Sequence, residues 1–223
     1  MGGYAGRPGK WYCPDPSRVR ESKAAWPMHA HIDPDIRGLE ADAYQRSGYF
    51  TSDEARSHGV SRQLLGHHIR QGRFEQIRRG LYRIRGFPSS RHDDVRERWL
   101  AVGAEKAVVS HESALALLEL SDNVPDKVHL LVARKHRGLR RPACVVIHTR
   151  PDDEEVPTVW RDGMPLTAPA RTLVDVVEEL QPEQATMAVR QALTLGLLTR
   201  RQLEEEAARR RRTHAVQTLL PDQ

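Results

Sequence analysis

A series of helix caps and glycines between residues 51 and 86 most constrains how this chain can fold. Thr51-Ser-Asp-Glu54 has the spacing of a capping box, in which the first and last side chains bond to each other's backbone N–H groups. This pattern predicts a short helix that ends near Gly59. Ser61 is a suitable N-cap for a further helix over residues 62–71. Because the linker between the two helices is so short, the pattern predicts a helix-turn-helix.

After Gly72 the spacing of apolar residues changes from a helical period to alternation. Residues 73–77 and 81–85 both alternate, and Arg78-Arg-Gly80 between them is suited to a turn. Two alternating segments joined in this way predict a β-hairpin, although Arg-Arg-Gly is a less specific turn signal than Asn-Gly.

A further helix is predicted before these elements, over residues 34–47, with Gly48 as its stop signal. Helix, helix-turn-helix and hairpin in that order predict a winged helix-turn-helix domain over residues 34–91. Residues 1–33 are rich in Gly, Pro and small polar residues without a sustained period, which predicts a flexible leader.

Residues 92–223 predict a mixed α/β domain with C-terminal helices, so the expected fold class is α+β. The segment 93–104 is expected to form a connecting helix. Thr199-x-x-Gln202 is a second capping box, within a helical stretch that starts at Pro182. The other elements predicted in this domain are strands at 107–110, 128–132, 144–148 and 164–167 and helices at 112–120 and 169–180.

The basic residues are unevenly distributed along the chain. Residues 1–91 carry a net charge of +7 and the remainder −2, and between Arg56 and Arg91 nine arginines face only one acid, Glu75. Such density indicates a polyanionic partner, while a solvated surface is the alternative. With a mean hydropathy of −0.63, no long apolar run and no apolar signal segment, the chain is expected to be cytoplasmic and to have no membrane partner.

The helix predicted over residues 62–71 has two contrasting faces at 100° per residue. Leu65 and Ile69 lie on the inner face. The outer face suits the major groove of double-stranded DNA, since Arg pairs with guanine and Gln with adenine. Glycine at position 66 is explained either by close approach of the backbone to DNA or by close helix packing. With the capping residue, the candidate DNA-binding residues of this helix are Ser61, Arg62, Gln63, Gly66, His67 and Arg70.

The predicted hairpin supplies further candidates for DNA contact. Its arginines are placed to reach phosphates on either side of the groove or to enter the minor groove. The alternative is a protein-interaction module in which the same arginines meet an acidic partner. The arginines concerned are Arg73, Arg78, Arg79, Arg83 and Arg85.

No pattern in the sequence indicates catalysis, a metal or a cofactor. Ser110-His-Glu-Ser113 is explained by capping of the following helix, and His129 and His148, within predicted strands, are expected to be structural. The strands of the second domain supply almost none of the clustered carboxylates that a metal-dependent nuclease requires. The prediction is a protein that is not an enzyme; a nucleic-acid-processing enzyme delivered by the winged helix is the alternative.

Several short motifs, in this order, resemble the AbiEi family of antitoxins over roughly residues 40–180. They are Gly48-Tyr-Phe-Thr51, Gly59-Val-Ser61, Gly72-Arg-Phe-Glu-Gln-Ile-Arg-Arg-Gly-Leu-Tyr-Arg83, Ser110-His-Glu-Ser-Ala-Leu115 and Pro165-Leu-Thr-Ala-Pro-Ala-Arg-Thr-Leu-Val-Asp175.

The resemblance implies a winged helix that binds inverted repeats in its own promoter and represses a type IV toxin–antitoxin operon. It also implies a C-terminal domain that counteracts a nucleotidyltransferase-like toxin, without need of a stable toxin complex. An antitoxin that acts by direct protein contact with its toxin is the alternative. Arg171 and Asp175 belong to the last motif and lie one helical turn apart. They are explained either as part of an antitoxin surface or as an ion pair that supports the domain, and the structural explanation is favoured.

Overall fold

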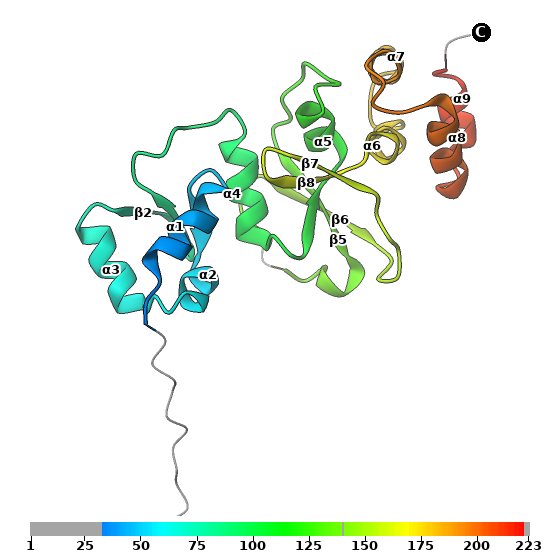
Figure 1. Ribbon diagram of the computed structural model, residues 1–223. Coiled ribbons are helices and arrows are strands. Elements are labelled where there is room, and N and C mark those ends of the chain that lie inside the picture. The colour runs from blue at the N-terminus through cyan, green and yellow to red at the C-terminus, as the bar shows by residue number, and fades with distance from the viewer. Residues whose placement is uncertain (1–32, 140, 221–223) are drawn as a thin grey trace, which may run out of the picture. The chain divides into compact units, whose positions relative to one another are not determined.

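The computed structural model describes residues 33–139 and 141–220 (Figure 1). The leader predicted over residues 1–33 lies outside them except for its last position. The described residues belong to one compact unit, Asp33–Gln223. None of the helices formed by the described residues has the length and apolar character needed to cross a membrane.

The first part of this unit is a winged helix-turn-helix, as predicted from the sequence. Its three strands form an antiparallel sheet in the order β1-β3-β2, so β2 is an edge strand. The strand β1 was not predicted and pairs with β3. The elements are α1 (Ile36–Tyr44), β1 (Tyr49–Thr51), α2 (Ser52–Ser57), α3 (Arg62–Arg70), β2 (Phe74–Arg78) and β3 (Leu81–Ile84).

The predicted caps determine where these helices begin and end. The Thr51 side chain accepts a hydrogen bond from the backbone N–H of Glu54, whose carboxylate accepts one from the backbone N–H of Thr51. Ser61 caps α3 by accepting from the backbone N–H of Leu64 at 3.2 Å. After α1, Gly48 adopts a φ of +84° and donates to the carbonyl of Ala43 at 2.8 Å. A positive φ of this kind favours glycine at a helix end.

A small aromatic core holds α3 against the hairpin. Leu65 is buried on the inner face of α3, in one cluster with Phe50, Phe74 and Tyr82. The rings of Phe50 and Phe74 meet edge to face, with centroids 4.9 Å apart. Because this core anchors only one face of α3, the opposite face is left to solvent.

The second part of the unit follows α4 (Asp93–Val102) and contains a mixed five-stranded sheet in the order β6-β5-β4-β8-β7. The pairs β4–β8 and β5–β6 are parallel, and β4–β5 and β7–β8 are antiparallel. This confirms the predicted mixed domain; β7 was not predicted. The elements are β4 (Ala107–Val109), α5 (His111–Leu117), β5 (Val128–Ala133), η2 (Arg134–His136), β6 (Val145–Arg150), β7 (Thr158–Arg161), β8 (Met164–Thr167), α6 (Pro169–Val176), α7 (Pro182–Thr194), α8 (Arg200–Arg209) and α9 (Thr213–Gln217).

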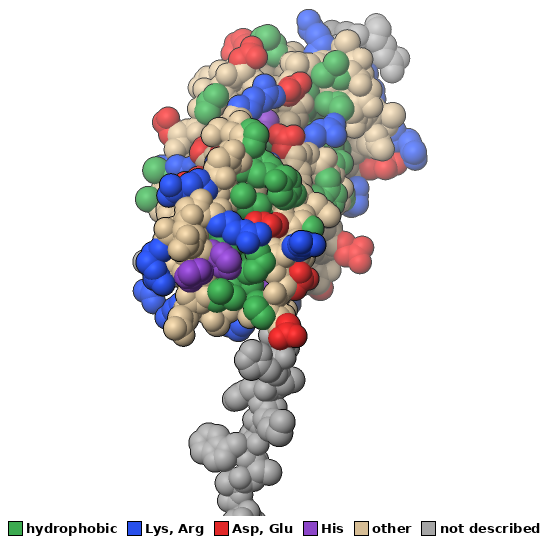
Figure 2. Space-filling view, turned by 60° about the vertical axis from the view of Figure 1, so that its left-hand side comes forward, with side chains coloured by type: hydrophobic (Ala, Val, Ile, Leu, Met, Phe, Trp, Pro, Cys, Tyr) green, Lys and Arg blue, Asp and Glu red, His purple; other side chains and the backbone are tan. Residues whose placement is uncertain are grey.

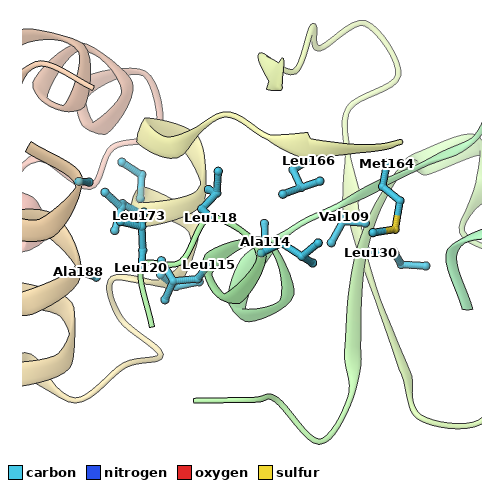
Figure 3. Packing of buried hydrophobic residues seen from close by; sticks show 14 of the residues in the cluster. Val109, Ala114, Leu115, Leu118, Leu120, Leu130, Met164, Leu166, Leu173 and Ala188 are labelled. Atoms are coloured by element: carbon cyan, nitrogen blue, oxygen red, sulfur yellow. The ribbon is translucent and has the colours of Figure 1, made fainter. Parts of the chain in front are cut away.

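The helix α5 joins this sheet to the C-terminal helices. Figure 3 shows Ala114 of α5 between Val109 and Leu166 of the strands on one side and Leu173 of α6 on the other. All four side chains are buried in one cluster. The sheet and the C-terminal helices therefore share one hydrophobic core.

Candidate nucleic-acid interface

The outer face of α3 is exposed and polar. Arg62, Gln63, His67 and Arg70 are exposed, while Leu65 on the opposite face is 3% exposed. No described residue forms an ion pair with Arg62 or Arg70. Figure 2 brings the side of the molecule that carries α3 forward, and Lys and Arg side chains lie beside histidine side chains near its lower left edge. This face offers hydrogen-bond donors and acceptors to a partner.

Gly66, in the middle of this face, is not required by packing inside the protein. A Cβ atom at this position would meet only Arg70 Nη1, at 3.6 Å, which is ordinary van der Waals contact. Close packing against another helix, one of the two explanations for this glycine, is therefore wrong. Glycine in a helix costs about 1 kcal/mol relative to alanine, and close approach of DNA to the backbone at Gly66 stays a prediction.

The hairpin arginines differ in what they contact. Arg79 and Arg85 are exposed and form no ion pair with a described residue. Arg73 donates two hydrogen bonds to Glu40, from Nε at 2.7 Å and from Nη2 at 2.8 Å. Arg78 donates from Nη2 to Glu97 at 3.0 Å. Two of the candidates are thus unpaired, and two are paired but accessible.

Arg83 lies outside the proposed DNA surface, contrary to the expectation from sequence. Its residue exposure is 7%, and Nη2 donates to Asp93 at 3.0 Å and to the carbonyl of Pro88 at 2.8 Å. The guanidinium also lies over the Tyr49 ring, 4.6 Å from its centroid. Burial of a charge is tolerated here because the carboxylate neutralises it. β3 is the central strand of its sheet, and Leu81, Tyr82 and Arg83 in it are all buried.

A second concentration of positive charge lies in the C-terminal domain and was missed by the charge count. Residues 127–151 contain no acid, and within them Arg134, Lys135, Arg137 and Arg141 are exposed. Their side chains form no ion pair with a described residue. The net charge of −2 for the whole C-terminal part concealed this segment, whereas a shorter counting window would have found it.

Arg171 and Asp175 form the centre of a buried ion network. The Arg171 side chain is 2% exposed and that of Asp175 is 4% exposed, and Arg171 Nε donates to the Asp175 carboxylate at 2.7 Å. Glu154 accepts from both Arg171 and Arg210, so the acidic segment 152–155 contributes a partly buried carboxylate. The carboxylates of Asp175 and Glu154 raise the pKa of Arg171 against the opposing effect of burial.

This burial overturns the assignment of Arg171 and Asp175 to an antitoxin surface. Neither side chain presents appreciable area to a partner, and both are used to hold α6 against the segment around Glu154. The favoured explanation, a supporting ion pair, agrees with the geometry.

Three histidines of the C-terminal domain, His111, His129 and His148, pack together. The rings of His111 and His148 stack with centroids 3.4 Å apart, and His148 Nε2 lies 3.2 Å from His129 Nδ1. Burial, and next to it the neighbouring imidazoles, lowers the pKa of His111 to about 3. Burial, and next to it the charge of a protonated His129, lowers the pKa of His148 to about 4. Imidazoles that stay neutral in this way are poor proton acceptors near pH 7. Among the described residues, no group of His, Cys, Asp and Glu side chains is arranged to hold a metal ion.

The ion network yields a prediction for stability. Arg171→Met should lower the free energy of unfolding by about 3–5 kcal/mol, because it leaves buried carboxylates without their cation. The matched control is Arg201→Met, which removes an exposed partner of Glu205 and should cost less than about 1 kcal/mol. Urea denaturation of both variants measures the difference. Equal small losses would show that the network contributes little.

Comparison with known proteins supports the assignment of both parts of the chain. Residues 43–85 match the family described as "Transcriptional regulator, AbiEi antitoxin", and residues 106–221 match the "AbiEi antitoxin C-terminal domain". No curated protein matches the chain. Among solved structures, it is similar to one titled "Crystal structure of RV2827C protein from Mycobacterium tuberculosis", with 15% identity, coverage of 86% of this chain and 80% of that chain, and a TM-score of 0.47.

The C-terminal match alone spans more than half of the chain, and the two matches follow each other in the order that the sequence motifs imply. The first contains the helix-turn-helix and the hairpin, and the second contains the mixed sheet and the C-terminal helices. This protein therefore belongs to the AbiEi family of antitoxins and transcriptional regulators.

Proposed function

We propose that the protein is a sequence-specific DNA-binding repressor of its own promoter and the antitoxin of a type IV toxin–antitoxin operon. The observation that carries the DNA-binding part is the outer face of α3. There, exposed hydrogen-bonding side chains flank Gly66, a glycine that the protein's own packing does not require. The double-stranded DNA partner is expected to contain inverted repeats.

In this proposal α3 and the hairpin have different tasks. Gln63 and Arg70 of α3 contact base edges and determine the sequence that is bound. Arg79 and Arg85 of the hairpin contact phosphates, which orients the protein on the duplex without selecting a sequence. The exposure of these four side chains and the absence of ion pairs between these arginines and described residues support this division.

We assign the antitoxin activity to the C-terminal domain, which has its own sheet and helices. Its target would be a nucleotidyltransferase-like toxin, counteracted without a stable complex. Because Arg171 and Asp175 are buried, a surface other than theirs must act on the toxin or its substrate. The proposal assigns no catalytic residue and no cofactor to this protein.

Phosphate contacts and base contacts should respond differently to substitution. The protein should bind a duplex taken from directly upstream of its gene more tightly than a random duplex, with affinity that falls steeply as salt rises. Arg79→Ala combined with Arg85→Ala should weaken both duplexes by the same factor and reduce the salt slope. Gln63→Ala should weaken only the upstream duplex, by about 1–3 kcal/mol. Fluorescence anisotropy titrations at several salt concentrations test this, and equal effects of both variants on both duplexes would contradict it.

Gly66→Ala should raise the stability of the protein and weaken its binding to DNA. The added methyl group has room, so the helix should gain up to about 1 kcal/mol of stability. The same methyl group should weaken DNA binding if the DNA approaches the backbone closely at this point. Urea denaturation and DNA titration of the same variant give both values. A more stable variant with unchanged affinity would remove Gly66 from the interface.

The antitoxin activity should be separable from DNA binding. Co-expression of the protein with the product of the adjacent gene should relieve any growth arrest that this product causes. The variant with Arg79→Ala and Arg85→Ala should relieve the arrest equally well from an inducible promoter while failing to repress a reporter. A wild-type protein that leaves growth arrested would refute the antitoxin assignment.

A further inference from the structure

Both ends of the edge strand β2 are held by carboxylates that belong to helices. At the start of the hairpin, Arg73 donates two hydrogen bonds to Glu40 of α1, at 2.7 and 2.8 Å. At the end of β2, Arg78 donates one to Glu97 of α4, at 3.0 Å. Arg73 and Arg78, two of the five arginines proposed from sequence for phosphate contacts, thus already contact a carboxylate in the free protein.

The two pairs are partly accessible to solvent. The side-chain exposures are 42% for Arg73 and 23% for Glu40, and 36% for Arg78 and 22% for Glu97. By contrast, Arg83 in its pair with Asp93 is 9% exposed. Exposed ion pairs contribute little stability because water and salt screen them. A DNA phosphate can therefore replace the carboxylate at Arg73 and Arg78, but not at Arg83.

The contacts of Arg78 are incomplete, whereas Glu97 is held independently. Arg78 Nε is buried without a hydrogen-bond partner, and only Nη2 reaches Glu97. The other oxygen of Glu97 accepts a hydrogen bond from the Tyr49 hydroxyl at 3.1 Å. If Arg78 turned to a phosphate, Glu97 would keep one partner and stay in place.

We propose that Glu40 and Glu97 compete with DNA phosphates for Arg73 and Arg78, so that these two carboxylates limit the affinity for DNA. The inference rests on the proposed DNA-binding function and adds residues that regulate it. Phosphate contacts carry no sequence information, so the competition weakens binding to every duplex. Base recognition by α3 then supplies a larger share of the total affinity at the promoter.

Glu97→Gln tests the competition directly. Glutamine keeps the volume of the side chain and an oxygen for the Tyr49 hydroxyl, but it carries no negative charge for Arg78. The variant should bind a random-sequence duplex about two- to fivefold more tightly than the wild type, and the upstream duplex by the same factor. The matched control is Glu205→Gln, which removes an exposed carboxylate paired with Arg201 at 3.1 Å and should leave DNA affinity unchanged.

A double-mutant cycle separates direct competition from a general change in charge. In an Arg78→Ala background, Glu97→Gln should produce no gain, because the arginine for which carboxylate and phosphate compete is absent. A gain that persists would be a long-range effect of charge and would overturn the inference. The same cycle with Glu40→Gln and Arg73→Ala provides an independent test if Glu97→Gln unfolds the protein, which its thermal unfolding would reveal.

The outcomes distinguish the inference from the function on which it rests. A wild-type protein without salt-dependent DNA binding refutes the proposed function and with it the inference. A wild-type protein that binds DNA, combined with Glu→Gln variants of unchanged or lower affinity, leaves the function intact. In that case the carboxylates hold the arginines in position for DNA instead of competing for them, and the inference is wrong.

Discussion

The position of the hairpin depends on one carboxylate that pairs with two buried arginines. Asp93 accepts a hydrogen bond from Arg83 of β3 and another from Arg96 of α4, each at 3.0 Å. Arg96 is 1% exposed and also donates to the backbone carbonyl of Asp162, between β7 and β8. Because a buried cation without a partner is strongly unfavourable, Asp93 links β3 to α4, and Arg96 in turn links α4 to this turn.

The need of a buried arginine for a carboxylate partner also determines which arginines of the basic segment are exposed. The sequence alone could not predict these partners. Within the basic segment the arginines look equivalent, since Glu75 is the only acid between Arg56 and Arg91. Their partners come from elsewhere in the chain: Glu40 precedes the hairpin, and Asp93 and Glu97 follow it. Charge density could therefore predict a basic surface, but the assignment of each guanidinium to the core or to solvent required the fold.

Helix starts could be predicted from the sequence where the capping interaction joins residues that are close in the chain. The capping boxes at Thr51 and Thr199 and the cap at Ser61 start helices as predicted, because each depends on side chains within three residues. The strands β1 and β7 were not predicted; in the fold each pairs with a strand that was, β1 with β3 and β7 with β8. The burial of Arg171 could not be predicted either, since its partner Glu154 lies 17 residues away in the sequence.

The helix α4 combines both kinds of ion pair within one turn. Asp93 and Arg96 make buried contacts that hold the fold, while Glu97, the next residue, makes a part-buried contact with Arg78. If a phosphate took Arg78, the hairpin would still be anchored through Arg83 and Asp93. The proposed exchange of the Glu97 carboxylate for a DNA phosphate would thus leave the buried pairs of Asp93 with Arg83 and Arg96 in place.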